Sequence, residues 1–171
     1  METEYFTITP DHGESGETSI TILPHTPNTG RTERIEEHIV KTQTEPSISK
    51  KIIIKQEALA EFVSFNNIEE IIINSQGGEL PIYGLTNSAS LTFSLDDDAL
   101  NLTLPETYNA GGSTAINGQP IAGDPGARNA FRFSIILNIA ENTTTEYLHT
   151  KLTVTAHNNQ SVCLIITQKI K

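Results

Sequence analysis

The apolar residues of this chain recur with the period of a β-strand. Short runs of β-branched and apolar residues are separated by Gly, Pro, Asn and Asp, and helical periodicity is nearly absent. From Phe131 to Leu137 every second residue is apolar and falls on one face of a strand. Arg132 and Ser134 fall on the opposite face. This pattern predicts an all-β sandwich.

The strand candidates cover most of the chain. They are residues 5–9, 19–23, 35–41, 51–56, 68–74, 80–83, 89–95, 100–104, 131–139, 147–156 and 162–167. Residues 56–65 are the one stretch that suits a helix, and they suit equally a linker that runs into a strand.

An internal repeat organises the chain. In the first copy Asn28 lies in a turn, a strand follows, and an apolar strand ends at Gln56. In the second copy Asn142 and Gln168 have the same places. The asparagine precedes the glutamine by 28 residues in the first copy and by 26 in the second. Such self-similarity indicates repeated structural units.

The repeat predicts tandem immunoglobulin-like β-sandwich modules, the first of them reduced. Residues 58–171 suffice for a complete sandwich of roughly 100 residues. Residues 1–57 supply only four strand segments. Because free strand edges tend to pair with other chains, we expect the first module to be stabilised by contact with the second module or with another subunit.

Charge and hydropathy narrow the choice of partners. The chain has 11 Lys and Arg against 21 Asp and Glu, which gives a net charge of −10. A protein that binds nucleic acid neutralises the phosphates with a clustered basic face, and such a negative chain is poorly suited to that. No run approaches the ~18–20 apolar residues of a membrane span. We expect neither nucleic acid nor membrane as a partner. The acidic start at Met1 and Glu2 lacks a signal peptide's basic and apolar regions, so we expect synthesis in the cytoplasm without export.

Motifs for catalysis and cofactors are absent from the sequence. The five histidines form neither His-x-His nor His-x-x-x-His, and no P-loop, Gly-x-Gly-x-x-Gly or Gly-x-Ser-x-Gly element occurs. We therefore expect no enzyme and no cofactor. The weak metal candidate is Asp96, Asp97 and Asp98, which suit either a Ca²⁺ site or, more simply, a solvated turn.

The single cysteine excludes an intramolecular disulfide. Cys163 lies in an apolar run, which favours a small buried side chain over a reactive thiol.

The segment from Asn109 to Arg128 is rich in Gly and Pro and longer than loops of compact domains usually are. Ile116 and Ile121 give it apolar anchors, and Arg128 gives it a cation at its exit. We expect an arm or elaborated loop that orders against a neighbouring subunit or another protein, with Asn109, Ile116, Ile121 and Arg128 as contacts. The alternative is a mobile surface insertion.

The aromatic residues bear on carbohydrate binding. Phe62, Phe65, Phe93, Phe131 and Phe133 fall on apolar strand faces, as core residues do. Tyr83 and Tyr108 are the candidates for exposed rings that stack on a sugar. Two tyrosines and no tryptophan make a weak sugar platform.

The chain resembles the BACON-type immunoglobulin-like modules of Bacteroidetes and their phages. The resemblance lies in residues 75–82 with their Gly-Gly turn, in 133–142, and in the closing strand 162–168 that ends in Thr-Gln. It departs from the family in having no Trp, and in Glu146 and Tyr147 where members often carry Arg after the asparagine. The resemblance implies the fold, and not a carbohydrate-binding surface.

The resemblance also implies a place in a virion. Small modules of this kind made without export look like structural proteins of crAss-like phages. We therefore expect a non-enzymatic auxiliary or decoration protein, oligomeric and bound to the major capsid protein or other virion proteins through repeated shallow contacts. The alternatives are a carbohydrate-binding or adhesin module, and a head-fibre or tail component.

Overall fold

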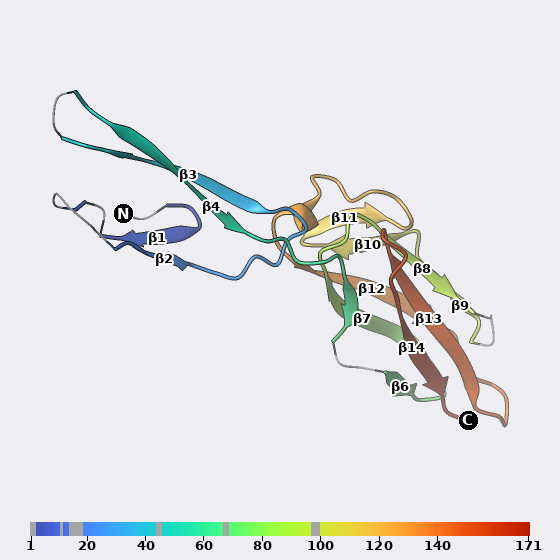
Figure 1. Ribbon diagram of the computed structural model, residues 1–171. Coiled ribbons are helices and arrows are strands. Elements are labelled where there is room, and N and C mark those ends of the chain that lie inside the picture. Colours follow the sequence, from blue (N-terminus) through green and yellow to red (C-terminus); the bar gives the residue numbers. More distant parts are fainter. Residues whose placement is uncertain (1–2, 11, 14–18, 44–45, 67–68, 97–99) are drawn as a thin grey trace.

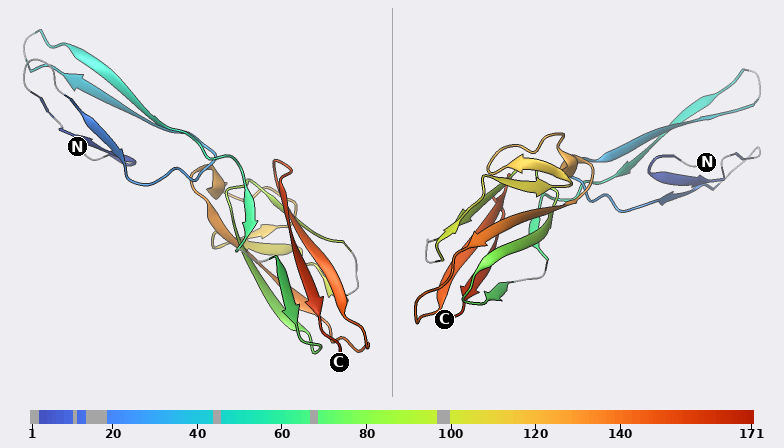
Figure 2. Two further views of the ribbon diagram at one scale, coloured as in Figure 1. Left: turned by 60° about the horizontal axis from the view of Figure 1, so that its bottom comes forward. Right: turned by 180° about the vertical axis from the view of Figure 1, so that it is seen from behind.

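The described part of the chain consists of β-strands and their connections, with one turn of 3₁₀-helix. A computed structural model describes residues 3–10, 12–13, 19–43, 46–66, 69–96 and 100–171. Strands β1 to β4 form a narrow N-terminal module at one end of an elongated molecule, and β5 to β14 form a C-terminal sandwich at the other end (Figures 1 and 2). The predicted all-β class is confirmed.

The strands follow one another with short connections. In the N-terminal module they are β1 (Phe6–Thr9), β2 (Thr21–Pro24), β3 (Arg34–Lys41) and β4 (Ser49–Gln56). In the C-terminal sandwich they are β5 (Val63–Phe65), β6 (Glu70–Ile73), β7 (Gly78–Thr86), β8 (Leu91–Leu95), β9 (Leu102–Thr103), β10 (Thr107–Ala110), β11 (Ser113–Ile116), β12 (Phe131–Ile139), β13 (Leu148–Ala156) and β14 (Ser161–Gln168). The 3₁₀ turn η1 is Pro125–Ala127.

The strand order of the C-terminal sandwich is that of an immunoglobulin-like domain. One sheet runs β11-β10-β12-β7-β5, with β9 also pairing β12, and the other runs β6-β14-β13-β8. With β7, β8, β12, β13 and β14 as strands B, C, E, F and G, these are the A-B-E-D and C-F-G sheets of that fold. Strand A of the fold is divided into β5 and β6. Strand β5 pairs with β7 in one sheet, and β6 pairs in parallel with β14 in the other.

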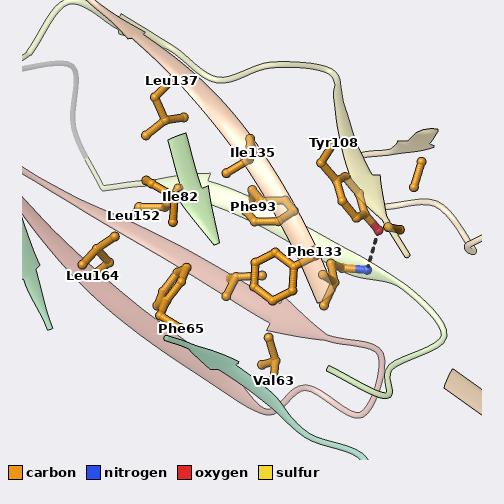
Figure 3. Packing of buried hydrophobic residues seen from close by; sticks show 14 of the residues in the cluster. Val63, Phe65, Ile82, Phe93, Tyr108, Phe133, Ile135, Leu137, Leu152 and Leu164 are labelled. Atoms are coloured by element: carbon orange, nitrogen blue, oxygen red, sulfur yellow. Dashed lines mark hydrogen bonds between the residues drawn. The ribbon is translucent and has the colours of Figure 1, made fainter. Parts of the chain in front are cut away.

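The alternating faces predicted from the sequence meet between the two sheets. In β12 every second residue from Phe131 to Ile139 is buried, and β13 buries Leu152 and Val154 completely. Phe133 lies at the centre, with its ring centroid 5.8 Å from that of Phe93 in an edge-on arrangement (Figure 3). Burial of this interior is the main source of the domain's stability.

The N-terminal module has a much smaller core. Its four strands form two separate two-stranded sheets, β1-β2 and β3-β4. Among the described residues of this module, the buried apolar ones are Phe6, Ile8 and Ile54, with half-buried residues packed alongside. A two-stranded hairpin is marginally stable by itself, so this module depends on what it is attached to.

Three sequence expectations need correction. Residues 57–62 form an extended linker that runs into β5, so the helix predicted as one option over 56–65 is absent. Cys163 is exposed, because it lies in the outward half of the alternation in β14 while Leu164 lies in the inward half. Phe62 is half-buried and does not belong to the hydrophobic core of the sandwich, although the sequence predicts a core residue there. No helix in the described part of the chain is long and apolar enough to cross a membrane.

Candidate functional site

The sequence repeat is also a repeat of hydrogen bonds. In the second copy the Asn142 Nδ2 group donates to the carbonyl oxygens of Glu146 and Lys169 at 2.8 and 3.0 Å. Its Oδ1 atom accepts the backbone N–H of Thr144 at 2.9 Å. Asn142 thus ties the turn to the end of the following hairpin.

Asn28 makes the same bonds in the first copy. Its Nδ2 group donates to the carbonyl oxygens of Thr32 and Glu57 at 2.8 and 3.1 Å, and its Oδ1 atom accepts the N–H of Gly30 at 3.0 Å. The glutamines correspond as well. Gln56 Nε2 donates to the carbonyl of Thr26, and Gln168 Nε2 donates to the carbonyl of Ala140. Each acceptor lies two residues before the asparagine of its copy. The hairpin β3-β4 is therefore the counterpart of β13-β14.

A joint of backbone hydrogen bonds fixes the N-terminal module to the sandwich. The N–H groups of Arg31 and Thr32 donate to the carbonyl oxygens of Gly126 and Ala127 at 3.0 and 2.9 Å. The N–H of Leu59 donates to the carbonyl of Gly30 at 2.9 Å. Two chain segments, one on each side of the hairpin β3-β4, are therefore held at this point.

Side chains reinforce the joint from both modules. The Arg31 Nε group donates to the carbonyl of Asn87 at 2.6 Å, and its guanidinium forms an ion pair with Asp124. The buried Arg34 donates to Asn129 Oδ1 at 2.7 Å and lies over the ring of Tyr5, 4.8 Å from its centroid. A buried guanidinium needs such partners, since unpaired buried charge is costly.

Glycine is required at two close backbone approaches, one between the modules at Gly30 and one within the sandwich at Gly126. A Cβ atom on Gly30 would lie 2.3 Å from the backbone carbon of Arg128, and one on Gly126 would lie 2.1 Å from the carbonyl oxygen of Asn87. Neither position tolerates a side chain without movement of the joint.

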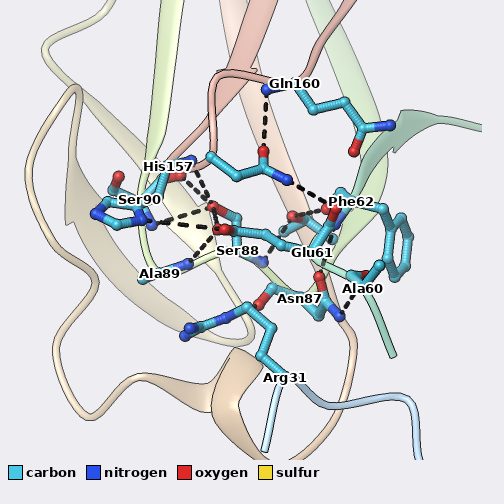
Figure 4. Close-up of polar contacts among 12 residues, drawn as sticks. Arg31, Ala60, Glu61, Phe62, Asn87, Ser88, Ala89, Ser90, His157 and Gln160 are labelled. Carbon is cyan, nitrogen blue, oxygen red and sulfur yellow. Dashed lines mark hydrogen bonds and ion pairs between the residues drawn. The ribbon is translucent and has the colours of Figure 1, made fainter. Parts of the chain in front are cut away.

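Asn87 and Ser88 anchor the linker to the sandwich (Figure 4). The fully buried Asn87 donates to the carbonyl oxygens of Thr29 and Ala60, both at 3.2 Å, and accepts the N–H of Phe62 at 2.8 Å. It thereby joins three segments with one side chain. The role of Asn87 is not predictable from the sequence, because nothing in its local pattern distinguishes it from the chain's other asparagines.

Ser88, Glu61 and His157 lie together but are not arranged for nucleophilic catalysis. The Ser88 Oγ atom is 2.5 Å from Glu61 Oε1 and 2.6 Å from the Ser90 carbonyl oxygen, and it accepts the backbone N–H of His157 at 2.9 Å. Its hydroxyl is buried. The imidazole of His157 is mainly exposed and faces Glu61 at 4.0 Å. A nucleophile must be reachable by its substrate, whereas the Ser88 hydroxyl is fully buried and hydrogen-bonded on all sides, so the cluster ties the linker to the sandwich.

The hairpin β3-β4 exposes an apolar stripe. Ile35, Ile39 and Ile53 are 49, 63 and 52% exposed, and they share the outer face because Ile53 lies opposite Glu37, between the other two. Ion pairs flank them: Lys51 with Glu37 at 2.6 Å and Lys55 with Glu33 at 3.5 Å. Lys55, Glu37 and Lys51 lie on the same face, each opposite one of the isoleucines, so apolar and charged side chains alternate there. Exposed apolar residues gathered on one face are typical of an interaction surface.

The predicted arm is largely part of the sandwich. Its first part forms the hairpin β10-β11, and Ile121 is buried in the chain's own core. The N–H of Ile121 donates to the Ala89 carbonyl at 2.8 Å. Ile121 is therefore not available as an anchor for another protein. Asn109 and Arg128 are exposed, and so is Ile116.

The exit of that segment packs against the N-terminal module of the same chain. Asp124 to Ala127 supply half of the joint described above. The four residues predicted as contacts do not form one surface, since Ile121 points inward while the other three are exposed.

The two tyrosines predicted to stack on a sugar differ in exposure. Tyr83 is 54% exposed on the outer face of β7, opposite Ser134 of β12. Ser134 also lines a shallow hollow of about 260 Å³ together with Asn109, Thr114 and Ile136. Tyr108 cannot stack on a ligand, because its ring is buried 5.0 Å from that of Phe93. The alternation in β10 points it inward.

The predicted acidic cluster is only partly described. Asp96 forms an ion pair with Lys151, and this pair raises the pKa of the lysine. Asp97 and Asp98 lie outside the described residues. Within the described ranges no group of three His, Cys, Asp or Glu side chains is placed to hold a metal ion.

Known proteins resemble this chain only distantly. No protein-family model matches the sequence, and no curated protein does. Among solved structures, domains 4 and 5 of the S-layer protein SbsC share 8% identity at a TM-score of 0.44, over 94% of this chain and 86% of that one. Extracellular cadherin domains 1–5 of protocadherin gamma B2 share 11% at 0.41, over 100% and 32%.

A third similar structure is an enzyme. The Bacteroides ovatus GH5 xyloglucanase in complex with a XXXG heptasaccharide shares 10% identity at a TM-score of 0.41, over 64% of this chain and 19% of that one. The chain therefore spans less than a fifth of the xyloglucanase. At such TM-scores these likenesses establish no kinship and transfer no activity.

Proposed function

We propose that this chain is a non-enzymatic structural protein that attaches to a repeating protein surface through its N-terminal module. The observation that supports this most is the contrast between the two modules. The C-terminal sandwich buries a complete core, whereas the described residues of β1 to β4 bury three apolar side chains and expose Ile35, Ile39 and Ile53. Exposed apolar surface of this kind is typical of a binding module.

The joint suits this task. Because it is held by backbone hydrogen bonds, two buried glycines and the buried Arg34, the N-terminal module projects from the sandwich in a set direction. Projection in one direction reduces the ordering cost of binding. Many shallow contacts repeated over a lattice then add up to firm attachment.

The finer proposal is that the lattice is the capsid of a phage and that this chain is an auxiliary or decoration protein bound to the major capsid protein. The test is its copy number per major capsid protein in purified particles, by quantitative mass spectrometry. Hundreds of copies per particle support a capsid lattice. About a dozen copies contradict it and support a fibre or tail component, as expected for one site per vertex. Absence from particles contradicts the virion altogether.

A second candidate function is glycan binding at the outer face of β7 and β12. It is favoured by the exposed ring of Tyr83 beside the shallow hollow, whose lining includes Ser134, Asn109 and Thr114. Glycan-array binding that is lost in Tyr83→Ala and kept in Tyr147→Ala, whose ring is 53% exposed elsewhere, would support it. Equal binding by both variants would contradict it.

A further inference from the structure

The hydrogen-bond repeat aligns β4 with β14 residue by residue. Gln56 corresponds to Gln168, so Ile53 corresponds to Ile165 and Lys55 to Thr167. The strand that pairs with the outer edge of β14 in the second copy therefore indicates what kind of strand the outer edge of β4 can accept in the first copy.

Strand β6 lies against that edge of β14. It runs parallel to β14, with Glu70 beside Ile165 and Ile73 beside Gln168. The N–H of Ile165 donates to the Glu69 carbonyl at 2.9 Å, and that of Lys169 to the Ile73 carbonyl at 3.0 Å.

The side chains of β6 complete the contact. The Thr167 hydroxyl donates to Glu70 Oε1 at 2.9 Å, while Ile71 and Ile73 pack against the core. The covering strand thus has two acidic residues followed by apolar residues that point inward at every second position.

In the N-terminal module the equivalent edge is open. Among the described residues, β4 pairs with β3 and with no other strand. The consequence is visible on the inner face: Leu164 of β14 is fully buried, whereas its counterpart Ile52 is only half-buried. An added strand would cover Ile52 and extend the core of Phe6, Ile8 and Ile54.

Charge indicates which strand can be added. β4 contains Lys50, Lys51 and Lys55, although the whole chain has a net charge of −10. Lys55 pairs with Glu33 at 3.5 Å and stands where Thr167 meets Glu70 in the second copy, so an acidic residue of an added strand would share this exposed lysine with Glu33. The same lysines oppose edge-to-edge pairing of β4 with β4 of a second copy, since like charges on paired strands are destabilising.

We propose that β4 receives a parallel strand from a different protein, with a sequence of two acidic residues followed by alternating apolar residues, as in β6. Backbone hydrogen bonds give such strand addition its affinity, and the side chains give it specificity. This proposal rests on the proposed assembly function and names the contact that it uses.

The test uses the full chain and a peptide copy of residues 69–75, Glu-Glu-Ile-Ile-Ile-Asn-Ser, carried on a soluble Gly-Ser tail. On titration, the NMR amide signals of residues 52–57 should shift, and the amides of Ile53 and Lys55 should become protected from exchange. Lys55→Glu should weaken binding about tenfold, because a like-charge pair replaces an opposite one. Lys41→Glu, the same charge change at an exposed position of β3, should bind like the wild type.

Three results would overturn strand addition. These are no shift at β4, shifts at β14 because the peptide displaces β6, or equal binding of a peptide that begins with two lysines. Thermal unfolding of both variants checks that they fold. The amount of this protein in purified particles distinguishes the failure of one proposal from the failure of the other. If the Lys55→Glu chain is incorporated at the wild-type level, strand addition alone is overturned. If the wild-type chain is missing from particles, the virion function is overturned.

Discussion

At the scale of single residues, two buried asparagines hold together segments that backbone pairing cannot reach. Asn142 is 1% exposed and Asn28 is 9% exposed, and each side chain uses both its donors and its acceptor on backbone groups. An asparagine is suited to this, because its amide offers a donor and an acceptor on one short side chain. The backbone groups that it satisfies would otherwise be left without partners.

Replacement of Asn142 tests this role. Asn142→Ala leaves the carbonyl oxygens of Glu146 and Lys169 without their donor, so we expect a loss of about 1–3 kcal/mol in the free energy of unfolding. Denaturant titration measures it. Asn138→Ala on the exposed face of β12 is the control, with an expected change within about 0.5 kcal/mol. Equal effects of the two substitutions would contradict the structural role of Asn142.

Tyr108 makes stability depend on pH at the alkaline end. Burial raises the pKa of its phenol above the ordinary 10.0, and the hydrogen bond from the Leu91 N–H lowers it in part. The unfolded chain therefore releases this proton at a lower pH than the folded chain. The contribution is fully present below pH 10.0 and is lost as pH rises through the folded pKa.

We expect Tyr108→Phe to flatten part of the alkaline decline in stability, as measured by denaturant unfolding at a series of pH values. Tyr83→Phe, which removes a hydroxyl from an exposed ring, is the control and should keep the decline. An unchanged decline in Tyr108→Phe would show that other groups cause it.

At the scale of elements, the joint depends on loops that approach backbone to backbone. The segment 28–32 lies against η1 and the residues after it, so close that Gly30 has no room for a Cβ atom. Gly126 of η1 lies equally close to the backbone of Asn87 in the same sandwich. Neither loop is stabilised by a sheet there, and the contact is made of hydrogen bonds and the ion pair of Arg31 with Asp124.

Gly30→Ala should open the joint. A Cβ atom 2.3 Å from the Arg128 backbone forces the loops apart, at a cost of about 1–3 kcal/mol. Hydrogen exchange should then speed up at the Arg31 and Thr32 amides while the amides of β12 stay protected. Gly78→Ala is the control, because its Cβ would meet open space and its cost comes from a positive φ of 117° alone. Unchanged exchange at the joint in Gly30→Ala would contradict this account.

At the scale of the whole molecule, the two modules differ in how far they can stand alone. The C-terminal sandwich has two sheets and a contiguous core, whereas the N-terminal module has two hairpins and a core of three buried residues. Short segments bury too little surface to offset the entropy of folding.

We therefore expect residues 58–171 to fold as a separate protein and residues 1–57 not to. Circular dichroism and dispersed NMR spectra distinguish the outcomes. The separate N-terminal fragment should gain structure when the peptide of residues 69–75 is added, if β4 accepts a strand. A folded N-terminal fragment without any addition would contradict the dependence of this module on its attachment.

The sequence by itself determined much of the architecture. The period of two in β12 and β13 gave the correct buried faces, because side-chain direction in a strand follows from position alone. The repeat of Asn28 and Asn142 located two hairpins that share one hydrogen-bond pattern. These features depend on residues close together in the chain, and such patterns can be recognised in the sequence.

Tertiary structure alone decided the rest. Ile121 lies in the segment 109–128, whose Gly and Pro content suggested a loop. Strands β10 and β11 nevertheless form at its start, because β12 offers β10 a partner edge and β10 in turn pairs with β11. The joint of Gly30, Gly126 and Asn87 brings together segments far apart in the chain. The open edge of β4 exists because no described strand of the N-terminal module pairs with it. Pairing between distant strands depends on which edges are free in the folded chain, and a sequence does not display that directly.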